Sequence, residues 1–254
     1  MVIPRIIPCL LLSKGGLVKG KRYKNHRYVG DPINAIKIFN DKYVDELFIL
    51  DIDASAEGRC ISPEIVSSFA GECFMPLAVG GGVSRAPQAK QLIACGAEKI
   101  AINSAAFLDK DLVGNLVADL GSQSVVGIVD YKTAGIFGKK NKVHYQSGKK
   151  NADYSPVDWA KCLEDMGAGE LLLSSIDREG SYSGFDLEVI KEVSKAVSIP
   201  VLAVGGGANL DDAKSAIEKG ASGVCYGSSF VFYGSREAVL ISYPERSSID
   251  NLFI

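Results

Sequence analysis

Two glycine triplets, each joined by a later serine, have the composition and spacing of phosphate-binding turns. Glycines 80–82 are followed along the chain by Asn103 and Ser104, and glycines 205–207 by Gly227 and Ser228. Glycine lets backbone N–H groups come close to a ligand, and a serine hydroxyl adds another donor, so each combination suits a phosphate. Two combinations indicate a substrate with an anionic group at each end. Tight turns that bind no ligand are the alternative.

Asp130 is a candidate for proton transfer. It directly follows the apolar run 124–129, so we expect it to end a buried strand and to work as a general acid or base. A structural carboxylate bonded to a neighbouring loop is the alternative. Four further acids follow other apolar runs: Asp51, Asp53, Asp177 and Glu179.

A glycine-rich basic segment, SKGGLVKGKRY at 13–23, carries Lys14, Lys19 and Lys21. A mobile basic loop can close over an anion. The alternative is a solvated surface loop.

The elements that position these residues are repeated along the chain. The segment 45–55 resembles 169–179, so that Glu46 matches Glu170, and later residues match at the same spacing. Each half alternates apolar runs with helix-length segments, which predicts parallel strands joined by helices. The predicted strands are 6–12, 47–52, 77–79, 100–102, 124–129, 171–176, 201–204 and 223–226; helices are expected from Asp31-Pro32 onward and at 62–72, 84–95, 109–120, 155–166, 185–197 and 209–219.

Eight strands in two matching halves predict an α/β fold, a (β/α)8 TIM barrel built from two duplicated half-barrels. An open doubly wound sheet is the alternative, but no Gly-x-Gly-x-x-Gly follows a first strand. We expect residues 1–254 to form a single barrel domain. A Gly/Lys-rich insertion at about 133–152 predicts a hairpin.

The charge and the cysteine and histidine content limit which classes of ligand the chain is expected to bind. With 28 basic and 30 acidic side chains, the net charge of −2 offers no general attraction for nucleic acid or an anionic membrane. Six scattered cysteines and two distant histidines predict no metal site and no cofactor, and they are typical of a reduced, cytoplasmic protein.

A second set of charges stands at the beginnings of predicted strands: Arg5, Glu46, Lys99 and Glu170. Alternating signs at the bottom of a barrel can form a ring of salt bridges. Such a ring is either a stabilising plug or a gate on an axial passage. Glu98, beside Lys99, is a further charge that we expect at this face.

The motifs RIIPCL, LVKG, GDP, DELFILDIDAS, AVGGG, INSAA, GSQSVVGIVD and SSIDREGSYSGFD resemble the cyclase subunit of imidazole glycerol phosphate synthase, over about residues 3–232. The resemblance implies a lyase-family barrel that receives ammonia from a glutaminase subunit docked at its bottom and passes it along the axis to a substrate with two phosphates. It assigns Arg5, Glu46, Lys99 and Glu170 to the ammonia gate, and Glu98 is placed at the partner interface. It assigns substrate contacts to Lys19, Gly82, Asn103, Ser104, Asp130, Gly206 and Ser228, and Asp130 is the expected catalytic acid or base. We predict further substrate or phosphate contacts at Ser174, Glu179, Gly180, Gly207 and Gly227.

The sequence departs from this family at important positions. Leu11 stands where the family has its first catalytic aspartate, and a leucine cannot transfer a proton. Glu179 replaces an aspartate, and Val204 replaces a small hydroxyl residue. At the C-terminus, β-branched residues and Pro244 oppose the long final helix of the family.

Leu11, the VGDPINA segment and the AVLISYP ending resemble a paralogous branch linked to surface-polysaccharide sugars. That resemblance implies an ammonia-conducting subunit whose partners are a glutaminase and a sugar amidotransferase, for amidation of a nucleotide-linked sugar. A working cyclase of histidine biosynthesis is the alternative, and it needs another acid, such as Asp51 or Glu179. A non-catalytic scaffold that binds a phosphorylated small molecule is the third hypothesis.

Overall fold

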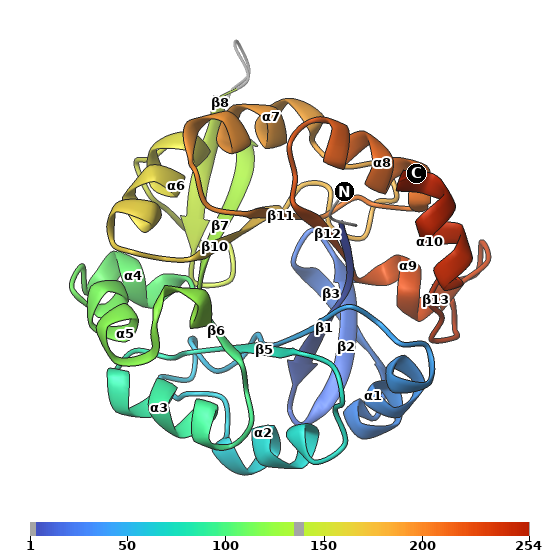
Figure 1. The fold of residues 1–254 in the computed structure, drawn as a ribbon, viewed down its shortest axis with the longest axis horizontal. Helices are drawn as coiled ribbons and strands as arrows, with labels where there is room; N and C mark the ends of the chain where they lie inside the picture. The colour runs from blue at the N-terminus through green and yellow to red at the C-terminus, as the bar shows by residue number, and fades with distance from the viewer. Residues whose placement is uncertain (1–3, 135–139, 254) are drawn as a thin grey trace.

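The computed structural model describes residues 4–134 and 140–253, and its centre is a closed barrel of parallel strands (Figure 1). Each barrel strand pairs with the next, and the last closes on the first through partners such as Ile6 and Val224. In barrel order the strands are β1 (Arg5–Ser13), β4 (Leu47–Asp51), β5 (Leu77–Gly80), β6 (Lys99–Ile102), β7 (Val125–Ala134), β10 (Glu170–Ser175), β11 (Val201–Val204) and β12 (Gly223–Tyr226). The predicted strands and the TIM barrel are confirmed.

Helices surround the barrel, and their ends follow local rules (Figure 1). Asp31 caps α1 by accepting a hydrogen bond from the Asn34 N–H, and Pro32 occupies the first turn. Gly96, Gly121, Gly167 and Gly220 follow helices with positive φ angles, as expected for helix stops. The long helices are α1 (Pro32–Asp41), α2 (Pro63–Ala70), α3 (Ala86–Ala94), α5 (Leu112–Leu120), α6 (Pro156–Asp165), α7 (Leu187–Ala196) and α8 (Leu210–Glu218). Among the described residues, no helix is long and apolar enough to cross a membrane.

Alternate residues of each strand face two different apolar clusters. In β1, Ile6 and Leu10 pack between the sheet and the helices, whereas Ile7 and Cys9 face the barrel interior. The interior cluster also includes Phe48, Ala78, Ala101, Val126, Leu172 and Leu202. This alternation is what strands covered on both faces require. It fills the barrel with apolar side chains below the strand ends.

The first strand of each half is followed by an antiparallel hairpin. After β1 come β2 (Gly16–Lys21) and β3 (Lys24–Gly30), and after β7 come β8 (Lys140–Tyr145) and β9 (Lys150–Asn151). The basic segment 13–23 is therefore the start of a paired hairpin and not a free loop. The insertion forms the β7–β8 hairpin, and its residues 135–139 lie outside the described residues.

The C-terminal segment differs in part from the sequence expectation. Residues 240–244 form no helix, as expected, and a small hairpin of β13 (Phe232–Tyr233) and β14 (Ala238–Val239) precedes them. However, a two-turn helix, α10 (Arg246–Phe253), follows Pro244. Ile249 of α10 is fully buried, and Tyr243 donates a hydrogen bond to the Ile6 carbonyl at the start of β1. The short helix packs against α8.

Candidate functional site at the barrel mouth

A cavity of about 500 Å³ opens at the carboxyl ends of the barrel strands, which we call the mouth. Its walls bring together most of the residues singled out from the sequence, including Leu11, Lys19, Gly82, Asn103, Ser104, Asp130, Ser174, Glu179 and Val204. These residues come from barrel strands and the loops that follow strands. The active end of a TIM barrel is built in this way. Within the described residues, no group of histidine, cysteine, aspartate or glutamate side chains could hold a metal ion.

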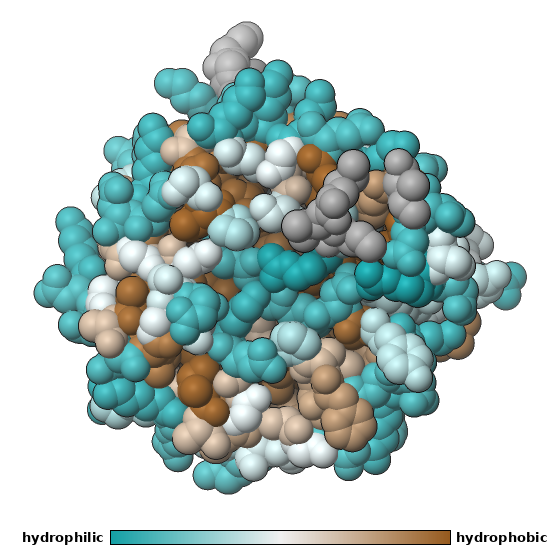
Figure 2. Space-filling view, in the orientation of Figure 1, coloured by the Kyte–Doolittle hydropathy of each residue, from teal (hydrophilic) through white to brown (hydrophobic). Residues whose placement is uncertain are grey.

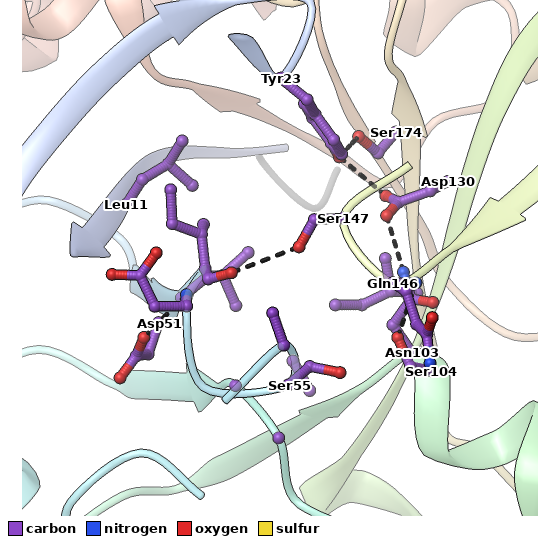
Figure 3. Close-up of a pocket in the computed structure, with 18 of the residues that line it drawn as sticks. Leu11, Tyr23, Asp51, Ser55, Asn103, Ser104, Asp130, Gln146, Ser147 and Ser174 are labelled. Atoms are coloured by element: carbon purple, nitrogen blue, oxygen red, sulfur yellow. Dashed lines mark hydrogen bonds between the residues drawn. The ribbon is translucent and has the colours of Figure 1, made fainter. Parts of the chain in front are cut away.

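Asp130 lies at the centre of a hydrogen-bond network (Figure 3). One carboxylate oxygen accepts a hydrogen bond from the Tyr23 hydroxyl at 2.8 Å, and the other accepts from the Asn103 amide at 2.7 Å. The Tyr23 oxygen also lies 2.7 Å from the Ser174 hydroxyl. Burial raises the pKa of Asp130 to about 6, against the lowering effect of these hydrogen bonds. A carboxyl with this pKa can exchange protons near neutral pH.

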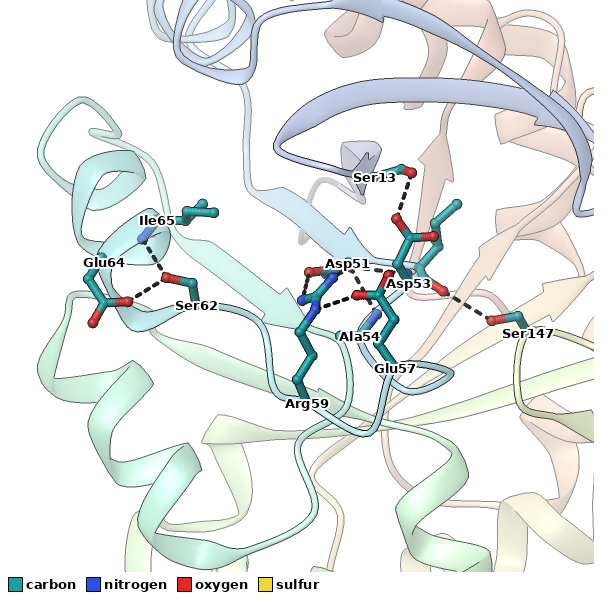
Figure 4. Close-up of polar contacts among 11 residues, drawn as sticks. Ser13, Asp51, Asp53, Ala54, Glu57, Arg59, Ser62, Glu64, Ile65 and Ser147 are labelled. Atoms are coloured by element: carbon teal, nitrogen blue, oxygen red, sulfur yellow. Dashed lines mark hydrogen bonds and ion pairs between the residues drawn. The ribbon is translucent and has the colours of Figure 1, made fainter.

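Leu11 and Asp51 lie across the mouth from Asp130 (Figure 3). Leu11 is half-buried and lines the cavity, so an apolar side chain faces the space opposite Asp130. Asp51 is bound by both ends of the Arg59 guanidinium and accepts hydrogen bonds from the Asp53 and Ala54 N–H groups (Figure 4). Asp51 therefore holds the loop after β4 in shape, and its acceptor positions are already in use.

Lys19 is the lysine of the basic segment that enters the mouth. Its side chain is 2% exposed, and its ammonium lies 3.3 Å from a carboxylate oxygen of Glu179. Lys14 stays exposed, and Lys21 pairs on the surface with Glu237. The expectation of a basic segment over the mouth therefore applies to Lys19 alone.

The remaining predicted phosphate contacts line a second, much smaller hollow. Its volume is about 10 Å³, and its walls are formed by Glu179, Gly180, Tyr182, Gly205, Gly206, Gly207, Cys225, Tyr226, Gly227 and Ser228. The two predicted phosphate sites are thus both at the mouth, but only the one near Gly82 and Ser104 adjoins the large cavity. Phosphate binding at either remains a prediction.

One glycine of each triplet lies where a larger residue would collide with the backbone of the protein. Gly82 has a φ of +63°, and an added Cβ would lie 1.8 Å from the Arg59 carbonyl oxygen. Gly206 has a φ of +101°, and its Cβ would lie 2.2 Å from the Gly184 carbonyl oxygen. Glycine is therefore required here for tight turns, whether or not a ligand binds.

Several residues of the mouth were not singled out from the sequence, among them Tyr23, His26 and Arg59. Tyr23 is at the hairpin turn, with a φ of +59°, and its neighbours in sequence are basic. An aromatic residue inside an otherwise polar segment was the available signal. His26 lines the cavity, and burial together with the charge of Lys19 lowers its pKa below 6.5.

The four charges at the other end of the barrel form a closed ring. Arg5 binds Glu46 and Glu170, and Lys99 lies 2.8 Å from each of the same two carboxylates. Figure 2 views this end, and hydrophilic residues occupy the centre of the face. Glu98 is exposed beside the ring and takes no part in it.

The chain matches known proteins along nearly its whole length. A family model described as histidine biosynthesis protein matches residues 5–236. A putative imidazole glycerol phosphate synthase subunit hisF2 of Pseudomonas aeruginosa is 45% identical, covering 98% of this chain and 99% of the relative. A putative subunit HisF of Leptospira interrogans is 42% identical over the full length of both, and a subunit HisF of Chlorobium phaeobacteroides is 39% identical over 94% of this chain and 95% of its own.

These matches agree with the barrel fold described above. The chain belongs to the HisF-type cyclase subunits of imidazole glycerol phosphate synthase, within the histidine biosynthesis protein family.

Proposed function

We propose that this chain is the barrel subunit of a glutamine amidotransferase system. It receives ammonia from a glutaminase subunit at the end where the barrel strands begin, and it conducts the ammonia to the mouth. The ammonia then serves the amidation of a nucleotide-linked sugar by a sugar amidotransferase. The observation that carries this proposal is the closed charge ring at the entrance of an apolar barrel, combined with Leu11 in the mouth.

The barrel interior is suited to a neutral molecule. Beyond the ring, its side chains are Ile7, Cys9, Phe48, Ala78, Ala101, Val126, Ile128, Leu172, Leu202, Val204 and Cys225, and none carries a charge at neutral pH. Burial raises the pKa of Cys9 to about 11, so its thiol stays protonated. An apolar lining favours ammonia over ammonium, because burying an unpaired charge costs far more than burying a small neutral amine.

The face around the ring offers a surface for the glutaminase. Phe74 and Tyr43, in the loops before β5 and β4, are 88% and 85% exposed. Figure 2 shows hydrophobic residues on this face over the region of α2, around the hydrophilic centre. Aromatic anchors beside a polar patch are typical of protein interfaces. Glu98 adds a charge to the same face.

The three residues considered as the second proton-transfer group, opposite Asp130, are not free to act as one. Leu11 has no proton to transfer, Asp51 is held by Arg59, and Glu179 is paired with Lys19. A cyclase mechanism that uses Asp51 or Glu179 in place of the missing aspartate would first have to break one of these ion pairs. This arrangement supports the conducting role over turnover of the histidine-pathway substrate.

The partnership is tested by copurification with a glutaminase subunit from the same organism, with and without glutamine. We expect a complex at micromolar protein and faster glutamine hydrolysis in it. Glu98→Lys and Phe74→Ser should weaken the complex. The matched control is Glu188→Lys, which reverses a charge in the first turn of α7 at the mouth end. Absence of any complex, or equal weakening by the control, would contradict the docking face.

A working cyclase is the second candidate, because several relatives carry the name imidazole glycerol phosphate synthase. It is tested by following the histidine-pathway substrate with purified protein and ammonium salt. We expect negligible turnover. Turnover within tenfold of the roughly 10 s⁻¹ typical of enzymes would support the cyclase instead. If turnover is absent, partial recovery in Leu11→Asp would show that the rest of the mouth still fits that substrate.

A further inference from the structure

The two hairpins at the mouth carry a large share of the basic side chains. Residues 13–30, which include β2 and β3, contain six lysines and arginines and no acidic residue, and residues 131–152, which include β8 and β9, contain the same. Together they hold 12 of the 28 basic side chains and none of the 30 acidic ones, although the whole chain has a net charge of −2. Positive charge is therefore concentrated at one end of a chain that is otherwise acidic.

The two hairpins lie side by side at the mouth. Both contribute to the cavity wall, the first through Tyr23 and the second through Ser147. An added Cβ on Gly148 would lie 3.4 Å from the Tyr23 ring, so the hairpins are close neighbours. The Ser147 hydroxyl donates to the Ile52 carbonyl, just after β4, at 3.2 Å, and this bond holds the second hairpin across the opening (Figure 3). The basic side chains are thus placed beside the exit of the barrel.

Most of these charges have no counter-charge inside the chain. Ion pairs use four of them: Lys19 with Glu179, Lys21 and Arg27 with Glu237, and Lys142 with Asp153. Within the part of the chain that the structure describes, six exposed hairpin cations have no carboxylate within 4.0 Å: Lys14, Arg22, Lys24, Lys140, Lys149 and Lys150. Of these six, Lys149 alone lines the cavity. The positive surface therefore extends well beyond the space that a small ligand could fill.

Exposed aromatic side chains accompany these charges. Tyr28 of β3 is 68% exposed, and Tyr233 of β13 is 69% exposed. The two strands are neighbours, because the Arg27 guanidinium lies over the Phe232 ring at 4.1 Å from its centre. Tyrosine and arginine are enriched at protein interfaces. A segment that lies on a membrane is usually a helix with one apolar face, and these hairpins have no such face. The surface therefore fits a protein partner better than a membrane.

The chemistry of ammonia gives a reason for a partner at this place. Ammonia that is released into neutral water takes up a proton, and the ammonium ion has no lone pair with which to attack an acceptor. An enzyme that uses ammonia from the barrel must therefore cover the mouth and exclude water from the exit.

We propose that the two basic hairpins form a docking face for the enzyme that consumes the ammonia, and that this enzyme presents an acidic surface to them. The hairpin face consists of the six exposed cations above together with Tyr28. The proposal rests on the proposed function, since it takes the sugar amidotransferase as the partner. It adds where that enzyme binds and by which charges. Complementary charges of this kind speed association and make it sensitive to salt.

The test is binding of the full chain to the sugar amidotransferase of the same organism, measured by surface plasmon resonance at two salt concentrations. Lys24→Glu combined with Lys140→Glu changes one exposed residue on each hairpin, and neither lines the cavity. This double variant should weaken the complex by about tenfold or more in 0.1 M salt. In 1 M salt the difference should largely vanish, because the screening length falls from about 10 Å to about 3 Å.

The matched control is Lys161→Glu combined with Lys214→Glu, which reverses two exposed charges on α6 and α8. It should bind as wild type does. Lys24→Gln combined with Lys140→Gln removes the two hairpin charges without reversing them, so it should give a smaller loss in the same direction.

A crossed comparison separates the hairpin face from the glutaminase face. Tyr28→Ala should weaken the amidotransferase complex at both salt concentrations and leave the glutaminase complex unchanged. Phe74→Ser, at the other end of the barrel, should do the reverse.

Wild-type affinity of the Lys24→Glu, Lys140→Glu variant in 0.1 M salt would overturn the proposal, and so would an equal loss in the control. Failure of the wild-type chain to bind the amidotransferase would also overturn it. Binding to vesicles of equal parts phosphatidylglycerol and phosphatidylcholine, lost in the same variant, would assign the face to a membrane instead. The proposed function is read separately, as glutamine-dependent amidation in a mixture of the wild-type chain, the glutaminase and the amidotransferase. If that reaction proceeds, these results contradict the docking face alone.

Discussion

The two ends of the barrel hold their polar groups in opposite ways. At the end where the strands begin, Arg5 and Lys99 each contact both Glu46 and Glu170, so every charge of the ring has two opposite partners. One ring oxygen, Glu46 Oε1, makes no hydrogen bond among the described residues, but it lies 2.8 Å from the Lys99 ammonium. At the mouth, the Ser228 hydroxyl and one oxygen of Asn103 are also buried without a hydrogen-bond partner among these residues, and neither has an ion pair. Asp130, which accepts a hydrogen bond from Asn103, has a pKa of about 6.

The difference shows at which end the buried polar groups find their partners within this chain. Charges that compensate one another need no ligand, and removing one of them leaves its buried partners uncompensated. Buried polar groups left without partners cost stability, and they are retained where a ligand or water supplies the missing contacts. We therefore expect changes at the ring to act on stability and changes at the mouth to act mainly on proton and ligand binding.

The largest effect is expected from Arg5→Ala. It leaves two buried carboxylates with Lys99 as their remaining ring partner, and breaking a buried charge arrangement costs about 3–5 kcal/mol of unfolding free energy. Urea denaturation at neutral pH measures the loss. The control at the same end is Arg246→Ala, whose exposed pairs with Asp45 and Asp250 should contribute less than about 1 kcal/mol. Equal losses for the two variants would contradict the assignment of the ring as a stabilising unit.

The next effect concerns Asp130 and pH. Its folded pKa of about 6 lies above the roughly 3.9 of an unfolded aspartate, so the folded chain binds the extra proton between these values. The contribution of Asp130 to stability should therefore fall as the pH rises from about 4 to 6, by up to about 3 kcal/mol, and then level off. Asp130→Asn lacks this dependence, so it should gain on wild type over the same pH range.

Denaturation curves at several pH values test this. The Asn103 amide can flip to offer its free oxygen to the amide that Asp130→Asn introduces, so the variant keeps a hydrogen bond there. A stability difference between the two proteins that does not change from about pH 4 to about pH 8 would mean that Asp130 titrates as an ordinary aspartate.

A smaller loss of stability is expected when a glycine near the mouth is replaced by alanine, and its size should depend on the space around the added Cβ. Gly58 and Gly82 have φ angles of +66° and +63°, but an added Cβ meets nothing at Gly58 and the Arg59 carbonyl at Gly82. Gly58→Ala should cost about 1 kcal/mol from backbone strain, and Gly82→Ala should cost about 2 kcal/mol more because the chain must move. Thermal unfolding of both variants measures the difference. Equal costs would show that the close approach at Gly82 relaxes freely.

The smallest effect is expected at the outer side of the hairpin. Glu237, in the turn between β13 and β14, pairs with Lys21, and its carbonyl accepts a hydrogen bond from Arg27, which stacks on Phe232. Because the ion pair is exposed, Glu237→Gln should cost less than about 1 kcal/mol of global stability. It should still speed amide hydrogen exchange in β2 and β3. Glu192→Gln is the control, and unchanged exchange in the hairpin would show that the inner contacts of Tyr23 and Lys19 are sufficient to hold it.

Much of the fold was accessible from local sequence signals. Continuous apolar runs predicted the strands because parallel strands are covered on both faces. Asp31-Pro32 and the later glycines predicted helix ends because a cap or a positive φ depends on one residue and its immediate neighbours. The repeated spacing of Glu46 and Glu170 predicted two matching halves, and closure of two such halves brings the strand ends, with Asp130 and Ser104, to one rim.

Other features were decided only by the tertiary structure. The pairing of Lys19 with Glu179, the bond from Tyr23 to Asp130 and the docking of α10 beside α8 join residues that lie far apart in the sequence. Local patterns carry no information on such contacts, since each depends on how the closed barrel aims a hairpin or a terminal segment. The sequence by itself determined the barrel, the ring and the position of Leu11. Closure of the barrel decided which polar groups at the mouth are already paired within the chain and which are left for a ligand, because burial and partner distance are set by that packing.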